Sequence, residues 1–294
     1  MKINELISAY NTDMQIRNLS KQTITNYINS LKLFSKYLED MNITEIEEVN
    51  GSIIKQYIYF LKNSGKKPTY INTTIKKLKA FYSYLNLDFE VDNVMSKIKQ
   101  LATEKSVVKT FDLEYAKVIS KPTGNNYLSI RNDTIITLLL ETGIRVGELV
   151  NIKIEDISLQ NILIHGKGAK QRQVPISKAL RRRLNKYLSV RNTFLENKNV
   201  DNDYLLLSSR LQQISLITVE KMIKKRCGKM NLPYYSAHKY RHFFTRQLLI
   251  NGIDVYTVSK ILGHESVEIT QQYLNGLNIE KMFPKVLSST PLSQ

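Results

Sequence analysis

Apolar residues recur at helical spacing through the first hundred residues and predict three amphipathic helices. Ser20 is placed to cap the first helix, and the polar break between Asn63 and Pro68 separates the second from the third. In chain order, the apolar positions are Ile24, Tyr27, Ile28, Leu31, Phe34 and Leu38, then Ile54, Tyr57, Ile58 and Leu61, then Ile71, Ile75, Leu78, Tyr82 and Leu85. Because the connections are short, these helices are predicted to form a compact bundle.

The pattern changes after residue 100. Residues 101–110 are polar and lack periodicity, which is typical of a linker between domains. Asp112 is placed to start a new helical region, and the apolar run 134–140 indicates a buried helix that ends at Gly143. Further helices are predicted after Ser177 and within 214–230, 236–252 and 255–262.

Short apolar stretches between these helices predict β-structure at 152–154, 162–164 and 204–207. The segment 166–175, GKGAKQRQVP, has the pattern of a β-hairpin, with Lys167 between two glycines. The chain is therefore predicted to be mainly α with a small antiparallel β-sheet.

The charge, the cysteine count and the lack of long apolar runs limit the classes of function that fit this chain. The formal net charge is +17, most of it after residue 100. Such a charge favours a polyanionic partner, most simply nucleic acid and next a membrane surface, with a solubility surface as the alternative. The single Cys227 excludes an internal disulfide and fits a reducing cytosol. With no apolar leader and no apolar run of about 20 residues, we expect a cytoplasmic, nucleoid-associated protein without a membrane partner.

Candidate chemistry concentrates near the end of the chain. His238, Arg241 and His242 share one face of a predicted helix, His264 follows a glycine that ends the next helix, and Tyr273 lies on a short segment of its own. Arg and protonated His suit a phosphate, and adjacent cations can lower the pKa of a Tyr hydroxyl so that it acts as a nucleophile. Together the set indicates phosphoryl transfer through a phosphotyrosine, although each residue alone fits an ordinary polar surface. The HxxxH spacing can bind zinc, but no third ligand is evident, so no metal site is predicted.

Arg145 and Glu148 lie three residues apart beside buried positions. Glu148 either neutralises Arg145, or it holds Arg145 while the guanidinium points at a phosphate, and the spacing fits both. Lys167 is either a proton donor at a hairpin tip or a solvated lysine. Other basic residues are candidates for DNA contacts, although a solvated face also explains them: Lys76, Lys77, Lys170, Arg172 and Arg181.

In order and spacing, these motifs resemble those of the tyrosine recombinases, the phage-integrase and Xer-like enzymes. They are TGIRVGEL around Arg145, GKG at Lys167, HKYRH from His238 to His242, ILGH ending at His264, and Tyr273 nine residues later. The stretch LSKQTITNYINSLKLF is similar to the family's core-binding domain, so the resemblance spans nearly the full chain. HFFTRQ differs from the HTFAT that relatives often have, which affects the expected packing more than the chemistry.

The resemblance implies two domains. Residues 1–100 would form the helical, SAM-like core-binding domain, 101–110 a linker, and 111–276 a mixed α/β catalytic domain. The tail at 277–294 would dock on its own protomer or on another.

The resemblance also implies a mechanism. The implied roles are Tyr273 as nucleophile, Arg145 and Arg241 on the nonbridging oxygens, Lys167 as proton donor to the leaving oxygen, His238 in proton transfer at the tyrosine, His264 on the phosphate, and Glu148 in support. The enzyme would cut and rejoin double-stranded DNA at a specific site through a Holliday junction, without ATP, metal or other cofactor. A homotetramer would hold two DNA sites, with or without accessory DNA-binding proteins, to integrate, excise or resolve DNA.

Two other functions fit parts of the pattern. A type IB topoisomerase-like enzyme shares the tyrosine chemistry, but the two-domain length and the apolar tail favour a recombinase. A non-catalytic DNA-binding protein could keep the fold, but every candidate catalytic position is filled.

Overall fold

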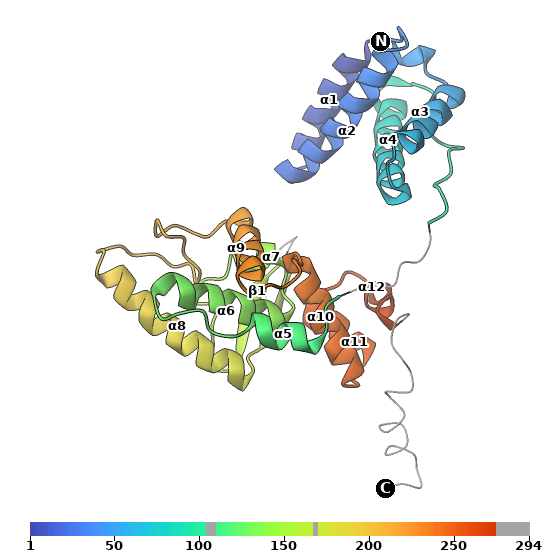
Figure 1. The fold of residues 1–294 in the computed structure, drawn as a ribbon. Coiled ribbons are helices and arrows are strands. Elements are labelled where there is room, and N and C mark those ends of the chain that lie inside the picture. Colours follow the sequence, from blue (N-terminus) through green and yellow to red (C-terminus); the bar gives the residue numbers. More distant parts are fainter. Residues whose placement is uncertain (104–109, 167–169, 275–294) are drawn as a thin grey trace, which may run out of the picture. The chain divides into compact units, whose positions relative to one another are not determined.

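The computed structural model describes residues 1–103, 110–166 and 170–274. Its contacts divide the chain into two compact units, residues 1–105 and 106–294 (Figure 1). The predicted fold class, mainly α with a small antiparallel sheet, is confirmed.

The first unit is a helical bundle whose elements are α1 (Ile3–Ile16), α2 (Lys21–Glu39), η1 (Ile46–Glu48), α3 (Gly51–Asn63) and α4 (Pro68–Phe89). The three predicted helices are confirmed as α2, α3 and α4, and the Ser20 side chain caps α2 by accepting from the Thr23 backbone N–H. The prediction missed α1, which buries Leu6, Tyr10 and Met14 in the core of the bundle. Its apolar residues have the same helical spacing as those of its neighbours, so the signal was present in the sequence.

The start of the predicted linker belongs to this first unit. The Asn72 side chain on α4 donates to the Leu101 carbonyl oxygen at 2.9 Å and accepts from the Leu101 backbone N–H at 2.8 Å. Thr110, at the other end of that stretch, donates to the Lys239 carbonyl oxygen within the second unit. Each end is therefore held by its own unit.

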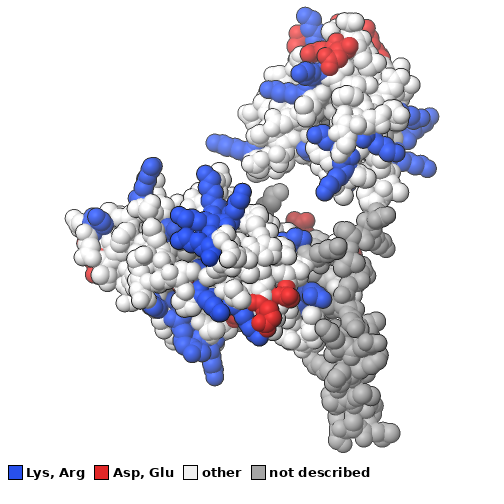
Figure 2. All heavy atoms as spheres, viewed as in Figure 1, with Lys and Arg blue, Asp and Glu red and all other residues white. Residues whose placement is uncertain are grey.

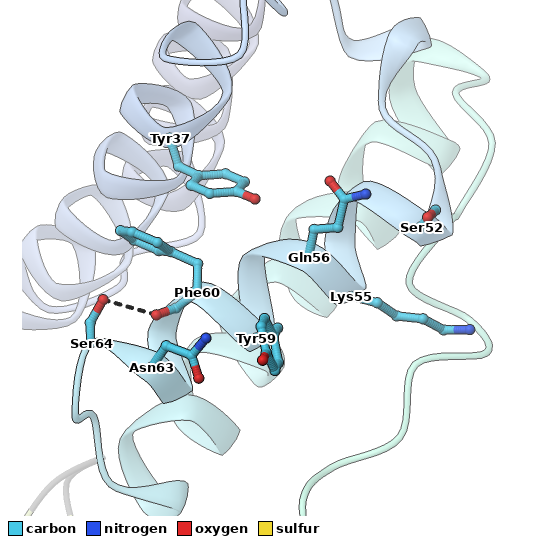
Figure 3. Close-up of a pocket in the computed structure, with 8 residues that line it drawn as sticks. All are labelled: Tyr37, Ser52, Lys55, Gln56, Tyr59, Phe60, Asn63 and Ser64. Atoms are coloured by element: carbon cyan, nitrogen blue, oxygen red, sulfur yellow. Dashed lines mark hydrogen bonds between the residues drawn. The ribbon is translucent and has the colours of Figure 1, made fainter.

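An open hollow of about 750 Å³ lies on α2 and α3 of the first unit (Figure 3). Tyr37 and Phe60 form an aromatic wall, and Tyr59, Lys55 and Gln56 extend it along α3. None of the candidate site residues lines this hollow.

The second unit contains the remaining elements: α5 (Leu113–Ile119), α6 (Tyr127–Thr142), α7 (Val146–Leu149), β1 (Asn161–His165), β2 (Gln171–Pro175), α8 (Lys178–Glu196), α9 (Leu216–Lys229), α10 (Ala237–Ile250), α11 (Val255–Leu262) and α12 (Val267–Gln271). α6 is buried along nearly its whole length and packs against α8 and α10 (Figure 1). This central position buries polar side chains such as Arg131 and Asp133 together with the apolar ones.

The β-structure is smaller than predicted. β1 and β2 pair antiparallel, with Ile162 opposite Val174 and Ile164 opposite Arg172, which confirms the hairpin. The predicted strands at 152–154 and 204–207 are wrong, because there the chain forms isolated bridges, Lys153 with Tyr204 and Leu207 with Gln213, and no named strand. Two backbone hydrogen bonds join these stretches, too few for a continuous ladder.

Candidate active site

α11 ends at Gly263, whose φ of +65° gives the left-handed conformation that terminates many helices. The backbone N–H groups of Gly263 and His264 turn back to carbonyl oxygens one turn earlier. The last carbonyl oxygens of a helix have no partner within it. Those of Ile261 and Leu262, together with that of Gly263, are therefore open to donors from elsewhere in the fold.

Three arginines from three different elements supply those donors. Arg172 Nε lies 2.8 Å from the Ile261 oxygen, Arg241 Nη2 lies 2.8 Å from the Leu262 oxygen, and Arg145 Nη2 lies 3.3 Å from the Gly263 oxygen. The carboxyl end of a helix also carries partial negative charge, which favours nearby cations. The turn after α11 thus gathers three guanidinium groups at one place.

Arg241, on α10, is almost completely buried, with 2% of its surface exposed. It donates a second hydrogen bond at 2.9 Å to the carbonyl oxygen of Gly143, the residue that ends α6. Burial, aided by the charge of Arg145, lowers its pKa to about 10, so the guanidinium is still charged at neutral pH. Gly143 has φ of +59°, and a Cβ there would lie 2.4 Å from a ring carbon of Phe244, so only glycine fits without a shift.

Glu148 joins the other two arginines. Its carboxylate accepts from Arg145 at 3.0 Å and from both terminal nitrogens of Arg172 at 2.9 and 2.7 Å. Burial alone would raise the pKa of Glu148, but the hydrogen bonds from Arg172 and Arg145 hold it below its ordinary value. Arg145 is therefore paired, yet 45% of its side chain is exposed and open to a further anion.

Tyr273 lies beyond α12 and is 8% exposed, packed against Leu249, Val258 and Leu262. Its hydroxyl makes a hydrogen bond with Nδ1 of His242. Burial raises the pKa of the phenol, although the Thr245 hydroxyl and the Arg241 charge act against that rise. Arg241 thus lowers this pKa, as expected of an adjacent cation, but the loss of hydration on burial outweighs it.

The other two histidines lie around this pair. His238 packs edge-on against the His242 ring, with 4.3 Å between ring centroids, and is more exposed than His242. His264 shares a 2.7 Å hydrogen bond with the Thr270 hydroxyl at the end of α12. Burial and the charges of Arg241 and Arg145 lower the pKa of His264 to about 4, so it is neutral at neutral pH.

The residues predicted to bind DNA fall into two groups. Lys76 and Lys170 are exposed. The side chains of the others are engaged within the protein: Lys77 donates to the Asn26 carbonyl and the Ser30 hydroxyl, Arg181 donates to the Ser158 carbonyl, and Arg172 donates to Glu148 and Ile261. Lys167 and the predicted tail at 277–294 lie outside the described residues.

Positive side chains also gather on the surface of the second unit, where Figure 2 shows a dense group over α9. α9 carries exposed Lys221, Lys224 and Lys225, and a hollow of about 620 Å³ between α6 and α9 is lined by Lys221, Lys225 and Lys229. Such a surface suits a polyanion.

Within the described ranges, no three His, Cys, Asp or Glu side chains lie close enough to hold a metal ion. No helix in that part of the chain has the length and apolarity needed to cross a membrane.

Comparison with known proteins agrees with this architecture. Residues 90–278 match the model of the phage integrase family, and residues 7–87 match that of the phage integrase N-terminal SAM-like domain. The chain belongs to the phage integrase family of tyrosine recombinases. It is 30% identical to a tyrosine recombinase XerC of Caldanaerobacter subterraneus subsp. tengcongensis, over 99% of this chain and 87% of the relative.

Solved structures of recombinases share the fold. A XerH site-specific recombinase bound to a palindromic difH substrate, in a post-cleavage complex, superposes with a TM-score of 0.75 at 20% identity, covering 93% of this chain and 81% of that one. A lambda integrase tetramer bound to a Holliday junction superposes with a TM-score of 0.68 at 17% identity, covering 90% and 78%. Both structures contain DNA.

Proposed function

We propose that this recombinase cuts and rejoins double-stranded DNA at a specific site through a covalent bond between Tyr273 and a 3′-phosphate. One observation carries the proposal: the turn after α11 gathers Arg145, Arg172 and Arg241, and Arg241 acts electrostatically on the Tyr273 phenol. A nucleophile beside fixed cations is the arrangement that attack on a phosphodiester requires, because negative charge grows on the phosphate oxygens.

The proposed steps assign a role to each group. The Tyr273 oxygen attacks the scissile phosphorus, and the bond from phosphorus to the 5′-oxygen breaks as the phosphotyrosine bond forms. Arg145 and Arg241 stabilise the nonbridging oxygens, and His264 donates a hydrogen bond to the phosphate. Lys167, proposed from its place in the GKG motif, supplies the proton that the leaving 5′-oxygen takes.

Rejoining reverses these bonds. The 5′-hydroxyl of the partner strand attacks the phosphotyrosine and releases Tyr273, so no ATP is consumed. Exchange between two duplexes needs four strand cuts, one for each nucleophile, and we therefore propose a homotetramer on two DNA sites. The first hundred residues would contribute DNA contacts, Lys76 among them, accessory DNA-binding proteins would be further partners, and the tail would join protomers.

The test is capture of the covalent intermediate. Duplexes from the regions that flank the gene, nicked close to each candidate cleavage position, are incubated with the full chain and resolved on a denaturing gel. A nick lets the short 5′-hydroxyl fragment diffuse away, so the protein–DNA adduct accumulates. We expect an adduct with the native chain and none with Tyr273→Phe. When two separate duplexes without a nick are supplied, we expect the native chain to join them.

The other outcomes are distinct. An adduct that persists in Tyr273→Phe would sink the proposed chemistry. Relaxation of supercoiled plasmid without joining of two duplexes would instead indicate topoisomerase-like activity.

A further inference from the structure

The histidine that meets the tyrosine hydroxyl is His242, whereas the resemblance implies His238. His242 Nδ1 shares a hydrogen bond with the Tyr273 hydroxyl, and their ring centroids are 5.3 Å apart. His238 lies one helical turn earlier and packs edge-on against the His242 ring. The contact to the reacting oxygen is therefore made by the residue after Arg241.

The buried phenol needs a proton acceptor. Burial raises the pKa of Tyr273, so the hydroxyl holds its proton at neutral pH, and a neutral phenol is a weak nucleophile. Burial, then the neighbouring His238, Lys239, Arg241 and His264, lower the pKa of His242 to about 4, so its ring is neutral. A neutral imidazole whose Nδ1 carries no proton can accept a hydrogen bond from the phenol O–H.

We propose that His242 is the catalytic base of this chain: its Nδ1 takes the phenolic proton as the Tyr273 oxygen attacks the phosphorus. This role rests on the proposed function. The proton moves from Oη to Nδ1 and leaves an imidazolium while the phosphotyrosine bond forms. In the rejoining step the same imidazolium returns the proton to the departing phenolate. His238 then acts through His242, as a positioning residue that supports its ring.

Bound DNA would make His242 a stronger base. The groups that face His242 are the positively charged Lys239 and Arg241 and the neutral His238 on its own helix, and His264 from the turn after α11. A phosphodiester beside Arg241 brings negative charge, which favours a protonated imidazole. Without DNA, burial and the same cations hold the ring neutral, so the phenol stays protonated until substrate is present.

A different role would give different kinetics. If the hydrogen bond only held Tyr273 at rest, its removal would leave cleavage unchanged or make it faster. If His242 accepts the proton, its loss slows cleavage, and the loss shrinks when the phenol becomes more acidic.

The experiment uses the nicked duplex that forms the adduct with the native chain. His242→Asn keeps a polar atom close to the place of Nδ1 but cannot take a proton. We expect adduct formation to slow about 10²- to 10⁴-fold, the usual range for a general base, with unchanged affinity for the duplex. Replacement of Tyr273 by 3-fluorotyrosine, a more acidic phenol, should recover part of that loss. His238→Asn is the comparison variant: because His238 acts through His242, its loss of rate should be smaller than that of His242→Asn, and fluorotyrosine should recover no more of it.

Each result decides the role. A His242→Asn rate within about threefold of the native rate, or a loss that fluorotyrosine does not reduce, would overturn the proposal. So would recovery confined to His238→Asn. If the thermal melt shows that His242→Asn is unfolded, His242→Gln undergoes the same measurement. Absence of any adduct with the native chain would instead refute the proposed function, and this role with it.

Discussion

Replacing Arg172 with methionine should destabilise the second unit more than its place on a hairpin strand indicates. The Arg172 side chain is 12% exposed, and it donates two hydrogen bonds to the buried Glu148 and one to the Ile261 oxygen. Breaking a buried ion pair costs about 3–5 kcal/mol, because the remaining charge stays buried. Arg145 still pairs with Glu148, so we expect the lower end, about 3 kcal/mol.

The assay is thermal unfolding of the full chain. In a domain of this size, 1 kcal/mol changes the melting temperature by about 2–4 °C, so Arg172→Met should lower it by about 6–12 °C. Arg182→Met is the matched control, because Arg182 is exposed on α8 and a surface change there should stay within about 0.5 kcal/mol. Arg172→Lys should fall between them, since one ammonium cannot span both oxygens of Glu148 and also reach Ile261.

The same variant separates a structural role from a DNA contact. If Arg172 neutralised a phosphate, its removal would lower the slope of log affinity against log salt by about 0.9. We expect an unchanged slope and a slower cleavage step, because Arg145 loses the neighbour that shares its carboxylate. Melting within about 2 °C of Arg182→Met, together with a reduced slope, would refute this reasoning.

Three further changes have defined outcomes. Gly143→Ala should cost at least about 2 kcal/mol in denaturant unfolding, because of its positive φ and the 2.4 Å contact, whereas Gly147→Ala, with open space around it, should be neutral. His242 and His264 have pKa values of about 4 in the folded chain against about 6.5 unfolded, so stability is full above pH 6.5 and falls as the pH drops toward 4. Unfolding at pH 7 and pH 4.5 should show a smaller loss in His264→Asn, and an equal loss would contradict the assignment. Duplex affinity, measured by fluorescence anisotropy, should fall steeply with salt, and Lys76→Ala should lower the slope by about 0.9 if that lysine meets a phosphate.

The helices could be predicted because local signals determine them. Ser20, Asn126, Ser177 and Asp254 each cap a helix with a side-chain oxygen, and apolar periodicity marks the buried face. The stretch at 204–207 is as apolar as a strand, but it forms isolated bridges, Tyr204 with Lys153 and Leu207 with Gln213, in place of a continuous ladder. The apolar pattern of a segment therefore predicts that it is buried, but it does not predict that another strand lies beside it.

The sequence offers the residue types of the candidate site but not their contacts. HKYRH shows two histidines on one face, yet which of them meets the phenol depends on where Tyr273 packs, 31 residues after His242 in the chain. Arg172 looks like any hairpin arginine, and its partners Glu148 and Ile261 lie 24 and 89 residues away. Its low exposure, the fact that separates an internal arginine from a DNA contact, is a property of the packed fold alone.

The choice of partners for the arginines explains how the site stays positive. A carboxylate beside each guanidinium would hold it in place but would also cancel its charge. Arg241 is held instead by the carbonyl oxygens of Gly143 and Leu262, which fix its geometry and carry only partial charge. Glu148 serves two arginines with one negative charge, so a net positive charge remains between them. Helix ends that stop at left-handed glycines expose such carbonyl oxygens, and for this reason the glycines at 143 and 263 matter to the electrostatics as much as to the turns.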